Sequence, residues 1–205
     1  MNYLLATRGE TLSPYFKFLK EAGQGLDPKT RSLLSLIAKV HSQSESGLRQ
    51  YLPRAMRDGV SAGEVIDALL FSLPMLGLTR INWAIDIILQ MDIPEFSVAL
   101  IDQPEQWQDI AGEDELIEGE AICRKLPERG LFLLRKGKEI KAYDSRCPHQ
   151  LTDIPEQALE KSTVTCPKHQ WAFNLQTGDC IAKGRHPLKA FATRITAAGR
   201  VEVFC

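Results

Sequence analysis

The chain has 205 residues, 44% of them hydrophobic, and its formal net charge is −1. This length allows one large domain or two small ones with packed cores. The near balance of charge gives no global field that would favour nucleic acid or an anionic membrane surface. Polar residues appear too early for a signal peptide, and no apolar run is long enough to span a membrane. We therefore expect a cytoplasmic protein with no nucleic-acid or membrane partner.

The first hundred residues have the apolar spacing of helices. A short helix is expected over residues 12–21. An Asp-Pro pair, an N-cap followed by proline at the first helical position, predicts a second helix over residues 27–42. A third is expected over residues 46–57, where Pro53 predicts a kink or a later start.

Two more helices are expected before residue 94. Ser61 and Glu64 have the spacing of a capping box and open an apolar stripe that continues to Leu73. Pro74 and Gly77 interrupt this helix, and the next one follows over about residues 81–93.

Beyond Trp107 the pattern changes to short alternating runs with glycines between or beside them, which predicts strands. The runs lie at residues 120–126, 131–135, 139–143, 163–166 and 200–204. The helical period is lost before them, around Pro104. We therefore predict an α+β chain of two domains: an all-α bundle over 1–95, a linker over 96–105 and an all-β domain over 106–205.

All five cysteines lie after residue 120, and their odd number and wide spacing are not those of a disulfide framework. They are Cys123, Cys147, Cys166, Cys180 and Cys205. Two of them belong to short clusters, Cys147-Pro-His149 and Cys166-Pro-Lys-His169. Both clusters follow strand-like runs, so both are expected on loops at strand ends. Cys123, Cys180 and Cys205 are expected to be unpaired.

These two clusters together supply two thiolates and two imidazoles. They could bind one zinc ion through all four side chains, or two irons, one through the cysteines and one through the histidines. A Cys-x-His first half is unusual for structural zinc, whose ligands close on a single ion. A metal centre is therefore expected, with both alternatives open on ligand types alone.

The stretch from Asp144 to Phe173 resembles the Rieske ferredoxin signature, Cys-x-His followed by Cys-x-x-His, and the likeness covers about residues 105–205. The resemblance implies a Rieske fold with one [2Fe–2S] cluster per chain. Cys147 and Cys166 would hold the buried ferric iron, and His149 and His169 the outer iron. Neutral imidazoles in place of two thiolates raise the reduction potential above that of all-cysteine ferredoxins.

The chain departs from parts of the Rieske pattern. It lacks the two extra loop cysteines of respiratory Rieske proteins, and so resembles the lower-potential ferredoxins that serve aromatic-ring dioxygenases. Leu151 and Gln170 stand where many relatives have glycine. Trp171 and Phe173 are expected to pack under the cluster loops and limit the access of water.

Basic residues near the two clusters suggest a docking surface for an acidic partner, with an ordinary solvated surface as the alternative. They are Arg146, Lys168, Lys183 and Arg185. His186 is expected to be a loop histidine and not a ligand.

Residues 27–90 are similar to the carboxymuconolactone decarboxylase and alkylhydroperoxidase-D family of helical domains. The similarity lies in residues 26–33, 54–59 and 64–70. The peroxidase branch of this family uses Cys-x-x-Cys followed four residues later by His, and these places hold Ser44, Gly47 and Tyr51 here. None of the three supports thiol chemistry.

Ser44 beside Glu45 or His41 would suggest hydrolysis, but no third partner is evident in the sequence. The resemblance therefore implies a degenerate helical domain kept for docking or for assembly into a homo-oligomer. No catalytic residue is assigned.

The leading hypothesis is a single-electron carrier and not an enzyme. It would accept electrons from a flavin-dependent reductase and pass them to a terminal oxygenase. One alternative is an enzyme whose helical domain has its own active site, fed by the cluster. Another is an interaction module that responds to the redox state.

Overall fold

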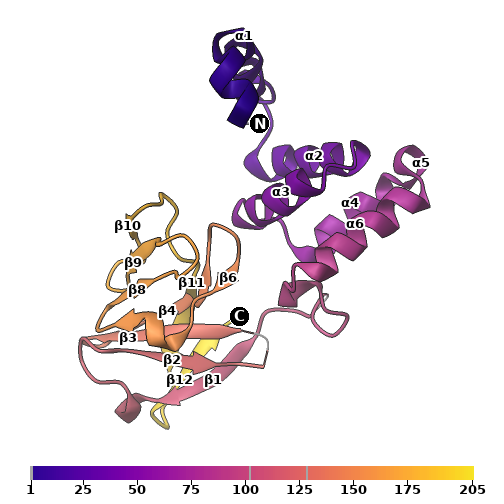
Figure 1. The fold of residues 1–205 in the computed structure, drawn as a ribbon. Helices are drawn as coiled ribbons and strands as arrows, with labels where there is room; N and C mark the ends of the chain where they lie inside the picture. Colours follow the sequence, from indigo (N-terminus) through magenta and orange to yellow (C-terminus); the bar gives the residue numbers. More distant parts are fainter. Residues whose placement is uncertain (1, 102, 128) are drawn as a thin grey trace.

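The computed structural model describes residues 2–101, 103–127 and 129–205, with the helices first and the strands after them (Figure 1). The helices are α1 (Asn2–Glu21), α2 (Pro28–His41), α3 (Glu45–Arg57), α4 (Ala62–Phe71), α5 (Leu73–Leu76) and α6 (Leu78–Gln90), followed by the 3-10 helix η1 (Pro94–Phe96). The predicted α+β class with two domains is confirmed.

Two helices begin where the capping residues predict. The Asp27 side chain accepts a hydrogen bond from the Thr30 backbone N–H at 3.0 Å, at the start of α2. At α4 the Ser61 hydroxyl accepts from the Glu64 N–H at 3.2 Å, and the Glu64 carboxylate accepts from the Ser61 N–H at 2.8 Å. These bonds satisfy donors that the first helical turn leaves without partners.

Two other helices differ from the prediction. Helix α1 begins at Asn2 and not near residue 12, and it is kinked at Arg8. Its apolar residues, such as Tyr3, are exposed, so no burial pattern in the sequence marks its first turns. Helix α3 continues through Pro53, which is buried together with Leu52 and Ala55. In the described part of the chain no helix, α1 included, is long and apolar enough to cross a membrane.

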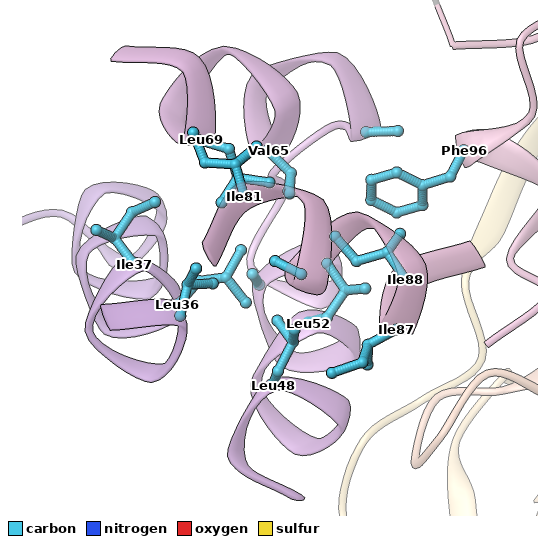
Figure 2. Packing of buried hydrophobic residues seen from close by; sticks show 14 of the residues in the cluster. Leu36, Ile37, Leu48, Leu52, Val65, Leu69, Ile81, Ile87, Ile88 and Phe96 are labelled. Atoms are coloured by element: carbon cyan, nitrogen blue, oxygen red, sulfur yellow. The ribbon is translucent and has the colours of Figure 1, made fainter. Parts of the chain in front are cut away.

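The helical half has a hydrophobic core of its own. Figure 2 shows Leu36, Leu48, Val65 and Ile88, from α2, α3, α4 and α6, pointing toward one another, with Phe96 of η1 at one end. Leu36 and Leu48 are fully buried. Burying each such side chain contributes about 1.5–3 kcal/mol, so this core is a main source of stability for the helical half.

The β-rich half is built from antiparallel strands. They are β1 (Trp107–Gly112), β2 (Ala121–Lys125), β3 (Gly130–Lys136), β4 (Glu139–Asp144), β5 (Arg146–Cys147), β6 (Thr152–Asp153), β7 (Leu159–Glu160), β8 (Thr163–Thr165), β9 (Ala172–Asn174), β10 (Cys180–Ala182), β11 (Ala190–Ile195) and β12 (Arg200–Phe204). One sheet has the order β1-β12-β11-β4-β3-β2, a second has β10-β9-β8-β7, and β5 pairs with β6.

Strand β3 separates two hydrophobic cores. Leu131 and Leu133 belong to a first core, which also contains residues of β11 and β12. Phe132 and Leu134 belong to a second core on the opposite face of β3. Alternate residues of a strand point to opposite faces, so a strand buried on both faces reads as an unbroken apolar run. The second core also contains Cys147 and Cys166, and it therefore supports the loops that carry both sequence clusters.

We expect Ser61→Ala to lower the free energy of unfolding of the helical half by about 1 kcal/mol, because the variant loses one side of the capping box. Urea unfolding followed by circular dichroism at the helical signal would measure this change. Ser46→Ala is the matched control, since Ser46 is an exposed residue in the first turn of α3. An equal loss in both variants would contradict the assigned role of the box.

Candidate metal centre

The two sequence clusters lie on two hairpin loops of matching design. The first loop joins β5 to β6 and the second joins β8 to β9. In each, the backbone N–H four residues after the cysteine donates to the cysteine carbonyl: Leu151 to Cys147 at 2.8 Å, and Gln170 to Cys166 at 2.9 Å. Each cysteine therefore stands at the base of a closed loop that turns its histidine toward the other loop.

The residues that close these loops have left-handed backbone conformations, with φ of 54° at Leu151 and 59° at Gln170. These are the two places where many relatives in the Rieske family have glycine. The loops thus keep a turn that suits glycine, although a residue with a Cβ atom pays roughly 1–2 kcal/mol there. Packing of Leu151 on the helical core and a 3.1 Å hydrogen bond from the Gln170 amide to the Pro167 carbonyl offset this strain.

The structure brings the four predicted residues together as two pairs. Cys147 and Cys166 are buried, each 1% exposed, with their thiols side by side. The rings of His149 and His169 lie 4.6 Å apart between centroids, inclined by 70°. His169 is exposed and His149 is half-buried. Thiols therefore lie inside and imidazoles lie toward the surface.

Burial raises the pKa of the Cys147 thiol to about 12, and the neighbouring Cys166 adds to this effect. Burial also lowers the pKa of His149, with further contributions from the positive charges of His169 and Arg57. A neutral imidazole is the form that binds a metal.

The Nδ1 atom of His149 is buried and has no hydrogen-bond partner among the described residues. A buried polar atom of this kind is unfavourable unless something satisfies it, and coordination to a metal would do so. Two pairs of ligands are what a [2Fe–2S] cluster needs, so these residues fit that group.

Aromatic rings cover one side of the histidine pair. Trp171 stacks on His149 with 4.7 Å between centroids and an angle of 5°. Exposed His186 lies 6.4 Å from Trp171, and the backbone of Gly184 rests on the indole so closely that a Cβ atom would lie 2.2 Å from it. Phe173 is fully buried in the core that contains both cysteines. Trp171 and Phe173 therefore pack beside the cluster loops, and limited access of water stays a prediction.

Arg146 is not part of an exposed basic rim, as the sequence suggested. It is 8% exposed, and its guanidinium donates two hydrogen bonds of 2.6 Å to Glu95 of η1, at the end of the helical half, and bonds of 2.7 and 3.0 Å to Asp144. The other three residues, Lys168, Lys183 and Arg185, are exposed. Arg146 directly precedes Cys147, so this ion pair holds the base of the first loop.

Burial by itself would raise the pKa of Glu95, but the hydrogen bonds and charge of Arg146 outweigh it and lower the pKa to about 2. Sequence reasoning missed Glu95, because its partner lies 51 residues away. It also missed Arg57, whose Nη1 donates to the Pro148 carbonyl of the first loop, 91 residues further along the chain. No local pattern marks contacts across such separations.

Ser44 and Tyr51 have structural roles in the helical half, where the peroxidase branch of the family has a cysteine and a histidine. Ser44 is the N-cap of α3, and its hydroxyl accepts from the Gly47 N–H at 3.3 Å. Tyr51 lies under the Lys39 ammonium, which is 4.9 Å from the ring centroid.

Comparison with known proteins agrees with this division. A Rieske [2Fe-2S] domain model matches residues 106–192, and a carboxymuconolactone decarboxylase family model matches residues 10–90. The ferredoxin component of the alkene monooxygenase system of Xanthobacter autotrophicus is 29% identical over 97 residues, which are 47% of this chain and 79% of that protein. The anthranilate 1,2-dioxygenase ferredoxin subunit of Burkholderia cepacia is 30% identical over 99 residues, 48% of this chain and 91% of the relative.

Among solved structures, one chain from a complex of reduced oxygenase and oxidized ferredoxin in carbazole 1,9a-dioxygenase is 24% identical to this chain. The match has a TM-score of 0.39 and covers 48% of this chain and 92% of the matched chain. The terminal oxygenase of carbazole 1,9a-dioxygenase from Nocardioides aromaticivorans IC177 is 27% identical, with a TM-score of 0.39 over 49% of this chain and 30% of the oxygenase.

The fold and the paired loops define a two-domain iron–sulfur protein. The chain belongs to the Rieske [2Fe–2S] ferredoxin family and carries a carboxymuconolactone decarboxylase family domain before its Rieske domain. The predicted fusion and the predicted [2Fe–2S] cofactor are confirmed.

We expect Glu95→Gln to lower the free energy of unfolding by about 3 kcal/mol at pH 7, because Arg146 keeps Asp144 but loses the carboxylate of Glu95. The folded-state pKa of Glu95 is depressed to about 2, from 4.5. Its contribution is therefore complete above pH 4.5 and disappears as the pH falls toward 2. Urea unfolding across this range should show the two proteins converging on acidification. Glu45→Gln, at an exposed ion pair with Arg49, is the control and should change little.

Proposed function

We propose that this protein is a single-electron carrier that passes electrons from a reductase to a terminal oxygenase-type enzyme. The observation that carries the proposal is the pairing of two buried thiols with two outward imidazoles, one of them exposed, in a Rieske domain. The names of the matching relatives support it, since they are ferredoxin components of monooxygenase and dioxygenase systems.

In this proposal Cys147 and Cys166 hold the inner iron, and His149 and His169 hold the outer iron. When bound, the cluster supplies a one-electron couple in which one iron alternates between the ferric and ferrous states. The buried thiols keep their end of the site away from water, and the exposed imidazole of His169 offers a short path to a partner. One electron enters from the reductase for each electron that leaves to the oxygenase.

Neither loop carries an additional cysteine, so no disulfide can join them. We place the reduction potential in the lower part of the Rieske range, which runs from about −150 to +300 mV. Exposed Lys168, Lys183 and Arg185 form a basic rim near the loops, suited to an acidic partner surface. A flavin-dependent reductase in the cytoplasm fits a chain whose five cysteines form no disulfide.

In the same proposal the helical half is not an enzyme but an assembly domain, with the boundary between the halves at residues 96–105. The Ser44 hydroxyl, the most nucleophilic group in place of the lost dithiol, is used as a helix cap. Large apolar side chains of this half are exposed, which favours a homo-oligomer. They include Leu34, Leu70, Phe71, Met75, Leu78 and Leu89.

Purified protein should be red-brown and, once reduced, should give a rhombic EPR signal of low average g. We expect Cys147→Ser and His169→Ala to lose most of this signal, because each removes an iron ligand. The matched controls are Cys180→Ser, a cysteine close enough to influence Cys147, and His186→Ala, the histidine beside Trp171. Both controls should keep the signal. A colourless protein that binds zinc would refute the proposed function.

Light scattering after size-exclusion chromatography should give a mass above that of one 23.0 kDa chain. We expect Phe71→Glu, at a side chain that is 90% exposed, to reduce this mass, because a charge would be buried in the interface between chains. Val98→Glu is the control, since Val98 is equally exposed but lies after the helices. A monomeric wild-type protein would exclude the assembly role.

A further inference from the structure

Arg57, the last residue of α3, reaches from the helical half to the first cluster loop. Its Nη1 atom donates to the Pro148 carbonyl at 2.5 Å and makes a longer contact of 3.5 Å with the His149 carbonyl. The backbone that it holds is therefore that of a proposed iron ligand and of the residue before it. Arg57 lies outside residues 106–192, which match the Rieske domain.

The charge of Arg57 is not cancelled by these contacts, because carbonyl groups are neutral. The side chain is half-buried, and burial lowers the pKa of its guanidinium, although an arginine remains protonated in proteins. It borders a cavity of about 710 Å³ between the two halves, together with Met56, Val60, Pro148 and Leu188. A half-buried charge interacts with its surroundings more strongly than an exposed one, and salt screens it less.

Reduction changes the charge of the centre beside it. In the oxidised state two ferric ions are balanced by two sulfides and two thiolates, and the imidazoles are neutral, so the added electron leaves one net negative charge. A fixed positive charge nearby favours the reduced state over the oxidised one. The expected effect of Arg57 is a higher reduction potential.

We propose that Arg57 is a positioning residue that the helical half supplies to the cluster, holding the first loop by its hydrogen bonds and raising the reduction potential by its charge. The inference rests on the proposed function, because it takes the cluster to lie between the two loops. It gives the helical half a role in electron transfer that is separate from assembly.

Other contacts keep the first loop in place when Arg57 is changed. The Leu151 side chain packs on the helical core, and Arg146 remains paired with Glu95. The loop also keeps its own closing hydrogen bond from Leu151 to Cys147. A change in the potential of an Arg57 variant can therefore be measured on a loop that is still folded.

The test compares Arg57→Gln with Arg54→Gln in the full-length, cluster-loaded protein, by redox titration with mediator dyes. Arg54 is exposed on the same helix, so its variant removes an equal charge without a hydrogen bond to the loop. At a fixed potential we expect Arg57→Gln to lower the ratio of reduced to oxidised protein by about threefold to tenfold, and tenfold corresponds to about 59 mV for one electron. Arg54→Gln should change this ratio by less than about twofold. High salt should abolish the effect of Arg54→Gln but not that of Arg57→Gln, because salt screens an exposed charge more than a half-buried one.

Arg57→Lys provides a second measurement, since lysine keeps the charge but lacks the rigid fork of donors. It should shift the potential in the same direction by a smaller amount. If Arg57→Gln fails to load the cluster, Arg57→Met, which also removes the charge, decides in the same titration, and an unchanged or higher potential in that variant would overturn the inference. Equal potentials for wild type and Arg57→Gln, or equal shifts for Arg57→Gln and Arg54→Gln, would overturn it as well.

These failures differ from failure of the proposed function. A wild-type protein without the Rieske EPR signal would remove both, whereas a normal signal with an insensitive potential would remove this inference alone.

Discussion

The buried ion pair between Glu95 and Arg146 is the contact on which the arrangement of the metal centre depends. Arg146 lies beside Cys147 in the sequence, and its guanidinium is held on one side by Asp144 of the sheet and on the other by Glu95. Removing such charges from water costs free energy, so a buried pair adds little net stability. A buried charge that is separated from its partner is strongly unfavourable. The pair therefore selects one position of the first loop relative to the helices.

Much of the site could be predicted from local sequence. The spacing Cys147-x-His149 and Cys166-x-x-His169 was enough to place both clusters on loops at strand ends, since each motif and the strand before it lie within a few residues. The capping box at Ser61 was equally local. Contacts between the halves were not predictable, because Arg57 and Pro148 are 91 residues apart and neither has a local pattern that indicates a partner. The first turns of α1 were missed for a related reason: their apolar residues are exposed and leave no burial pattern.

Leu151 connects the first cluster loop to the helical half. A leucine in a left-handed turn is unfavourable in an isolated loop, where glycine would serve better. Its side chain packs against the helical core, so the same residue that strains the loop joins the loop to its neighbour. Gln170, at the equivalent place in the second loop, has a left-handed turn too, but its amide bonds within its own loop and its side chain is exposed. The loops thus share one backbone design, while the helical half holds the first of them.

This asymmetry bears on the direction in which an electron leaves. Around His149 lie the Trp171 ring and the carbonyl contacts of Arg57, and its Nδ1 is buried. His169 belongs to the second loop, and it is exposed. In the proposed function the exposed edge of His169 would be the better exit, because an electron tunnels most easily where a partner can approach closely, and exposed Lys168 beside it would meet an acidic surface. Because Arg57 contacts the first loop and His169 lies in the second, the helical half can influence the centre without covering the face that a partner would use.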